Sequence, residues 1–109
     1  MPFCASGRKI RLESGIALKE AIITVEGIVQ QVGFRYFTVK NAERLGVKGY
    51  VQNLDSGSVE IVAQVSDETK IEELIEILKK GPPSAVITDI RVDYNNSVNR
   101  EFPGFDVRY

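Results

Sequence analysis

The spacing of apolar residues changes along the chain, and each change marks a different expected element. Residues 21–28 are mostly apolar and β-branched, which predicts a central strand. Over residues 34–45 the apolar positions recur as they do on one face of a helix. Gly46 follows, and glycine readily adopts the left-handed conformation that ends many helices. The chain is therefore expected to start its fold with a strand and a helix.

The middle of the chain predicts a hairpin. Residues 47–52 form a second strand, and residues 58–65 alternate along a third strand whose outer face is mixed. Residues 53–57, which read Asn-Leu-Asp-Ser-Gly, have the composition of a turn between them. Gly49, inside the second strand, indicates either a bulge or a close approach of another backbone.

A second helix and two further strands complete the pattern. Ser66 or Asp67 can cap this helix, and Gly81 followed by proline ends it. Its buried stripe is expected at Ile71, Leu74, Ile75 and Leu78. Residues 86–94 alternate again as a strand does, and a short terminal strand is expected within residues 105–109.

The order of these elements defines the expected fold class. Strand, helix, strand, strand, helix, strand is the split βαβ arrangement of ferredoxin-like folds. We therefore expect an α+β sandwich, βαββαβ, with an antiparallel sheet and two helices on one face. Asn53, at the end of the second strand, is expected beside the first strand and close to the loop that follows it. Many unrelated activities share this fold, so function has to be argued from a site.

Composition narrows the class of protein. A chain of 109 residues is expected to form one domain, and 43% apolar residues allow a modest core. The net charge of -1 provides no basic field for nucleic acid or anionic lipid, and no apolar run reaches membrane-spanning length. Cys4 is the only cysteine, which suits a reducing compartment, so a cytoplasmic protein is expected.

Residues 1–20 differ from the rest of the chain. They mix basic residues with glycine and serine, and they lack the continuous apolar core of a signal peptide. We expect residues 1–20 to be a flexible or loosely docked N-terminal extension, and residues 21–109 to be the folded domain.

The junction between the first strand and the first helix carries the strongest chemical signal. Residues 27–35 end the strand, pass through a glycine and start the helix, with Arg35 at its beginning. The first N–H groups of a helix are unpaired, and the helix dipole adds partial positive charge to the full charge of Arg35. This junction predicts a site for a small anion, in particular a phosphoryl group.

The same segment resembles the active-site signature of the acylphosphatase family, and reads Gly27-x-Val29-Gln30-x-Val32-Gly33-Phe34-Arg35. The similarity continues through Ala42-x-x-Leu45-Gly46-Val47-x-Gly49-Tyr50-Val51-x-Asn53, then Asp55-x-Gly57-Ser58-Val59-Glu60, then Lys80-Gly81-Pro82-Pro83. These motifs keep the family's order and spacing across residues 21–109. The resemblance implies a metal-independent enzyme that hydrolyses acyl phosphates.

The resemblance also implies which residues act. Arg35 and Asn53 are the expected catalytic residues, with Arg35 holding the phosphoryl oxygens and Asn53 positioning the attacking water through its side-chain amide. The expected phosphate-binding residues, mostly through their backbone amides, are Gln30, Gln31, Val32, Gly33, Phe34 and Arg35. The expected partners are a small-molecule acyl phosphate and inorganic phosphate, which is both product and inhibitor. No metal, cofactor, nucleic acid or membrane is implied, and a monomer is expected.

The residue types suit that chemistry. Arginine binds two oxygens at once through its planar fork and stays protonated. The chain has no histidine, but a carboxylate leaving group with a pKa of about 4 departs without a proton from a general acid. The acidic residues show no spacing typical of metal ligands.

Gln31 departs from the family, which usually has glycine at this position. If the loop requires a positive φ at residue 31, glutamine costs about 1–2 kcal/mol that glycine avoids. The side chain would then either crowd the phosphate or donate a hydrogen bond to it. Position 31 therefore bears on affinity and rate more than on the fold.

Two other functions fit parts of the sequence. A ferredoxin-like anion-binding or regulatory module would keep the phosphate site with little or no turnover; Gln31 favours it, whereas Arg35 and Asn53 favour the enzyme. An RNA-binding module ranks below both. Its sheet would carry aromatic residues on the first and third strands in a basic setting, and the first and third strands expected here have neither aromatic residues nor a net positive charge. Asn53 alone would more often be an ordinary turn residue.

Overall fold

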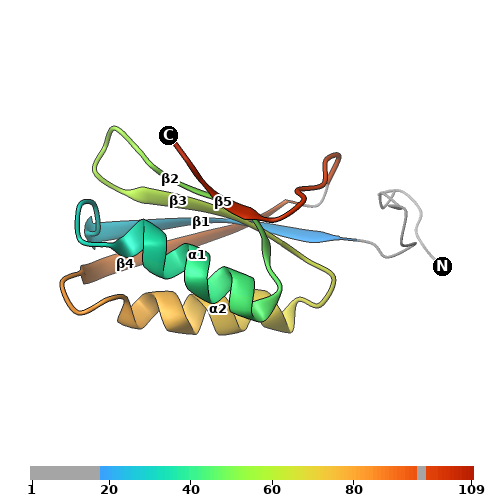
Figure 1. Ribbon diagram of the computed structural model, residues 1–109, viewed down its shortest axis with the longest axis horizontal. Coiled ribbons are helices and arrows are strands. Elements are labelled where there is room, and N and C mark those ends of the chain that lie inside the picture. The colour runs from blue at the N-terminus through green and yellow to red at the C-terminus, as the bar shows by residue number, and fades with distance from the viewer. Residues whose placement is uncertain (1–17, 96–97) are drawn as a thin grey trace.

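The computed structural model describes residues 18–95 and 98–109, and within them the chain forms one sheet covered by two helices (Figure 1). The elements are β1 (Lys19–Ile28), α1 (Phe34–Leu45), β2 (Lys48–Asn53), β3 (Val59–Val65), α2 (Thr69–Lys80), β4 (Val86–Asn95) and β5 (Phe105–Arg108). The strand order is β4-β1-β3-β2-β5, and both helices lie on the same face of the sheet. The predicted α+β class and its split βαβ arrangement are confirmed.

The sheet is mixed rather than wholly antiparallel, which corrects one part of the predicted fold. β1 pairs antiparallel with β3 and β4, and β2 pairs antiparallel with β3, but β5 runs parallel to β2. The chain leaves β4 at Asn95, opposite Glu20 near the start of β1, and enters β5 at Phe105, opposite Gly49 near the start of β2. Because β5 is entered from the end at which β2 begins, it has to run in the same direction as β2.

The core lies between the sheet and the two helices. Its largest fully buried side chains come from both layers and include Phe34, Ile23, Ile61, Ile71, Leu74 and Leu78. Along α2, three residues of the predicted stripe are buried, and Ile75 packs against the same cluster while only partly buried. In the described part of the chain, neither helix is long and apolar enough to cross a membrane.

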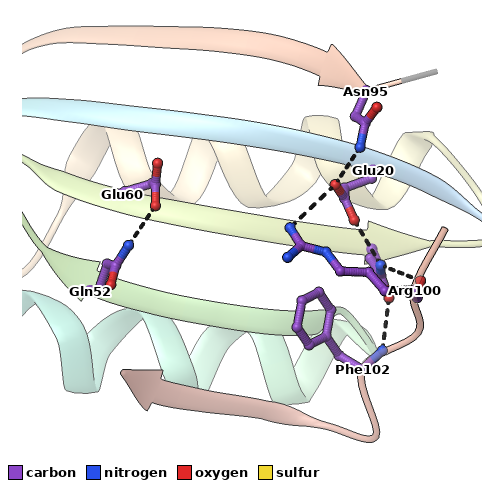
Figure 2. Close-up of polar contacts among 7 residues, drawn as sticks. Glu20, Gln52, Glu60, Asn95, Arg100 and Phe102 are labelled. Atoms are coloured by element: carbon purple, nitrogen blue, oxygen red, sulfur yellow. Dashed lines mark hydrogen bonds and ion pairs between the residues drawn. The ribbon is translucent and has the colours of Figure 1, made fainter. Parts of the chain in front are cut away.

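The face of the sheet that the helices leave open is polar where β1 begins (Figure 2). Glu20 is only 1% exposed there, and its carboxylate accepts hydrogen bonds from Gln64 Nε2 at 2.7 Å and Asn95 Nδ2 at 2.8 Å. Arg100 Nη2 lies 3.7 Å from the same carboxylate. Lys19 and Glu20 therefore belong to β1, although the sequence placed them in the extension. The remainder of that expected extension, apart from residue 18, lies outside the described residues.

Gly49 confirms the predicted close approach of another backbone. Its φ is 140°, and a Cβ atom at this position would lie 1.8 Å from the carbonyl oxygen of Val62 on β3. We expect Gly49→Ala to lower the free energy of unfolding by about 2–4 kcal/mol, because backbone strain and overpacking each cost about 1–3 kcal/mol. Urea unfolding of the variant and the parent chain measures this loss.

Gly57→Ala is the matched control for that experiment. Gly57 also has a positive φ, 98°, but a Cβ atom there would meet no atom of the described residues within 4 Å. Only the conformational cost of about 1–2 kcal/mol is then expected. Equal losses in the two variants would contradict the steric argument for Gly49.

Candidate active site at the loop between β1 and α1

The loop that joins β1 to α1 is anchored at both ends and irregular between them. Val29 and Phe34 are each 1% exposed and pack in the core. Between them φ alternates in sign, because Gln31 has a φ of 64° and Gly33 a φ of 80°, whereas neither Gln30 nor Val32 has a positive φ. Successive residues of alternating handedness turn their N–H groups toward one side and form a concave nest that favours anions.

The N–H groups of this loop are available to a ligand. Outside helices and strands, no backbone hydrogen bond in the described residues is donated by the amides of residues 30–33. Phe34 opens α1, so its N–H group also lacks a partner within the helix. The first turn of α1 has no acidic residue, and Arg35 adds a positive charge there. The loop and the helix start together form a positive, donor-rich surface.

Gln31 has the positive φ that the sequence analysis considered for this position. Among the described residues it is the only non-glycine residue with a positive φ. The loop thus does hold residue 31 in the left-handed region, where an ordinary side chain costs about 1–2 kcal/mol relative to glycine.

The side chain of Gln30 joins this loop to the turn between β2 and β3. Its Nε2 donates to the carbonyl oxygen of Leu54 at 2.8 Å and to that of Ser58 at 3.0 Å. Sequence reasoning had assigned only the backbone amide of Gln30 to the site. No local signal could have shown the side-chain role, because the partners lie 24 and 28 residues away.

Asn53 reaches the same end of the molecule by a different route from the one expected. Asn53 ends β2, but β3 lies between β2 and β1. The prediction that these two strands are neighbours was therefore wrong. The Gln30 side chain spans this separation by binding the turn that starts just after Asn53. Figure 1 shows the β1–α1 loop and the β2–β3 turn at one end of the fold.

The side-chain oxygen of Asn53 has an unusual environment. Successive residues of a strand point to opposite faces, so Asn53 shares a face with the core residue Val51 and points toward the helix layer. Its Oδ1 is buried and has no hydrogen-bond partner in the described structure. Buried polar atoms in native proteins are nearly always paired, and an exception calls for a functional explanation.

A cavity of about 330 Å³ opens beside Arg35. Its walls are Val29, Gln31 and Gly33 from the loop, Phe34, Arg35, Tyr36 and Val39 from α1, and Val107 and Tyr109 from the C-terminal segment. The Arg35 guanidinium lies 5.2 Å from the centre of the Tyr109 ring, within reach of a cation–π interaction.

The cavity contains only part of the predicted site. Gln31, Gly33, Phe34 and Arg35 line it, whereas Gln30, Val32 and Asn53 are not among its lining residues. Gln30 turns its side chain toward the hairpin instead, and Val32 packs against the core. Within the described ranges, no group of three or more histidine, cysteine or acidic residues is arranged to hold a metal ion.

These features define a ferredoxin-like domain with a nest of backbone N–H groups at its first strand–helix loop. The family model of acylphosphatase matches residues 21–107 of this chain. The chain belongs to the acylphosphatase family.

Individual relatives agree over nearly their whole length. The chain is 48% identical to an acylphosphatase of Pasteurella multocida over 92 residues, which cover 84% of this chain and 99% of that protein. It is 46% identical to an acylphosphatase of Thermotoga maritima, with the same coverage of both chains. The crystal structure of acylphosphatase from Bacillus subtilis matches with a TM-score of 0.79 and 36% identity, covering 84% of this chain and 99% of that one.

Proposed function

We propose that this protein hydrolyses acyl phosphates to a carboxylate and inorganic phosphate, with Arg35 and Asn53 as its catalytic residues. The observation that carries the proposal is the pairing of two features at one end of the fold. One is the N–H nest that leads to Arg35, and the other is Oδ1 of Asn53, which has no partner among the described residues. The Gln30 side chain holds the two together.

The phosphoryl group is bound by the nest and by Arg35. Backbone N–H groups of residues 30–34 donate to its oxygens, and the helix dipole favours their negative charge. The Arg35 guanidinium binds two oxygens in parallel, as its planar fork allows. Phosphoryl transfer depends mainly on positioning and charge stabilisation, so these groups act most strongly on the transition state.

Asn53 orients the water that attacks phosphorus. Its Oδ1 accepts a hydrogen bond from this water, which leaves a water lone pair directed toward the phosphoryl group. The missing partner of Oδ1 is then a water molecule of the reacting complex. The oxygen is buried in the free protein, so substrate binding would have to open room beside it for this water.

Departure of the leaving group needs neither an acid nor a metal. The bond to phosphorus breaks with its electron pair on the carboxylate oxygen, whose conjugate acid has a pKa of about 4. The proton of the attacking water ends on the released phosphate or in solvent. Arg35 and the nest neutralise the charge that develops on the phosphoryl oxygens.

The remaining functional assignments follow from this chemistry. Inorganic phosphate, the product, binds the same nest and is expected to inhibit competitively. We propose a monomer, since every group named above comes from one chain, and a cytoplasmic location, since the sole cysteine, Cys4, suits a reducing compartment.

The purified chain is expected to hydrolyse acetyl and benzoyl phosphate at an unchanged rate in excess EDTA, because no step of the proposed reaction uses a metal. Release of inorganic phosphate measures the rate. Loss of activity in EDTA that a divalent ion restores would contradict the metal-free mechanism. Phosphate binding without any hydrolysis would instead identify an anion-binding module.

A further inference from the structure

The backbone of Gln31 points to a role for its side chain. Every other residue with a positive φ in the described part of the chain is a glycine, so Gln31 alone accepts the strain of a side chain in this region. The side chain is exposed, and neither a hydrogen bond nor core packing within the described structure offsets that strain. Backbone strain of this kind clusters at active sites and ligand-binding segments.

The residues that line the cavity beside Arg35 are of two chemical kinds. The nest and Arg35 supply donors and positive charge for a phosphoryl group. Apolar or aromatic side chains come from Tyr36 and Val39 on α1, and from Val107 and Tyr109, whose ring lies against the Arg35 guanidinium. Tyr36 and Tyr109 are 70% and 98% exposed, so their rings are open to a ligand.

The size of the cavity also points beyond inorganic phosphate. Its volume of about 330 Å³ falls within the range of small-molecule sites, about 300–1,000 Å³. An acyl phosphate seated with its phosphoryl group in the nest would therefore place its acyl group against these apolar and aromatic side chains. Flat or aromatic acyl groups match such walls, because stacked and edge-on ring contacts add to the burial of apolar surface.

Gln31 supplies the only side-chain amide on the walls of this cavity. An amide both donates and accepts, so it can pair with a carboxamide or a similar polar group on the acyl part. We infer that Gln31 is a specificity-determining residue, which selects aromatic acyl phosphates that carry such a polar group. This inference rests on the proposed hydrolysis of acyl phosphates.

The test compares two substrates, benzoyl phosphate and benzoyl phosphate with a carboxamide at ring position 3 or 4. In the parent chain the carboxamide derivative is expected to have a kcat/KM about 5-fold higher, the size of effect that one neutral hydrogen bond provides. Gln31→Gly removes the side chain and the strain together. Gln31→Leu keeps a side chain of comparable bulk at the same strained position but removes the amide.

Both variants are expected to lose the preference for the carboxamide, measured as the ratio of the two kcat/KM values, because both lack the side-chain amide and any change in the nest alters both substrates alike. A preference retained in Gln31→Leu would overturn the inference, because bulk rather than the amide would then be selective. Parallel changes in both substrates and in phosphate inhibition, with the ratio unchanged, would overturn it too, since Gln31 would then act on the nest. No preference in the active parent chain refutes this inference alone, whereas hydrolysis of neither substrate refutes the proposed function itself.

Discussion

Arg35→Gln is expected to lower kcat/KM for acyl phosphates by about 1,000-fold or more and to remove most affinity for inorganic phosphate, because charge stabilisation by arginine in phosphoryl transfer is of this order. The fold is expected to survive, since in the described structure the Arg35 side chain contacts the exposed ring of Tyr109 and forms no ion pair. Lysine should restore little activity, because it lacks the two-pronged fork.

Arg44→Gln is the matched control on the same helix. Arg44 lies in the last turn of α1, is exposed, and donates from Nη2 to Asn41 Oδ1 at 3.1 Å. Its loss removes the same charge at the far end of the helix and should leave kcat/KM within about 2-fold. Steady-state rates and phosphate inhibition in both variants provide the comparison. Near-normal turnover in Arg35→Gln would rule out the assignment of Arg35.

Asn53→Ala is expected to lower kcat by about 100-fold while the inhibition constant of inorganic phosphate stays nearly unchanged. The proposed target of Asn53 is the attacking water, and a misplaced nucleophile slows the chemical step without weakening phosphate binding. Asn53 Oδ1 has no hydrogen-bond partner in the described structure, so no donor loses a hydrogen bond when this oxygen is removed.

Gln52→Ala tests whether such an effect is specific to the helix-facing side of β2. Gln52 precedes Asn53 but points to the open face of the sheet, where its Nε2 donates to Glu60 Oε1 at 2.7 Å (Figure 2). Its kcat should match that of the parent chain. If Asn53→Ala weakened phosphate binding and turnover by the same factor, Asn53 would be a ligand of the phosphoryl group rather than of water.

Elements governed by nearby residues could be predicted closely from the sequence. α1 spans Phe34–Leu45 as expected, because both its apolar spacing and its terminal Gly46 are local signals. Gly49 indicated a close backbone approach because glycine is otherwise disfavoured inside a strand. Arg35 could be singled out because the strand, glycine and helix that surround it are adjacent in the chain.

Features that depend on distant residues could not be predicted in the same way. Glu20 looks like part of a polar extension until β3 and β4 supply its hydrogen-bond donors. The insertion of β3 between β1 and β2 is a property of the whole sheet, so Asn53 was placed beside the wrong strand. The polarity of a single residue also says nothing about where its side chain points, so the hydrogen bonds of Gln30 were missed.

The two hydrogen bonds of Gln30 would make the proposed site fail as a unit when the protein is warmed. Hairpin tips open at lower free energy than the strands behind them, and opening of the β2–β3 turn would remove both carbonyl partners of Gln30 at once. The loop would then lose its support as Asn53 loses its position. Phosphate binding and hydrolysis would therefore be lost together during thermal inactivation, with no intermediate that binds phosphate but is inactive. The turn, rather than the core, would set the highest temperature at which the enzyme works.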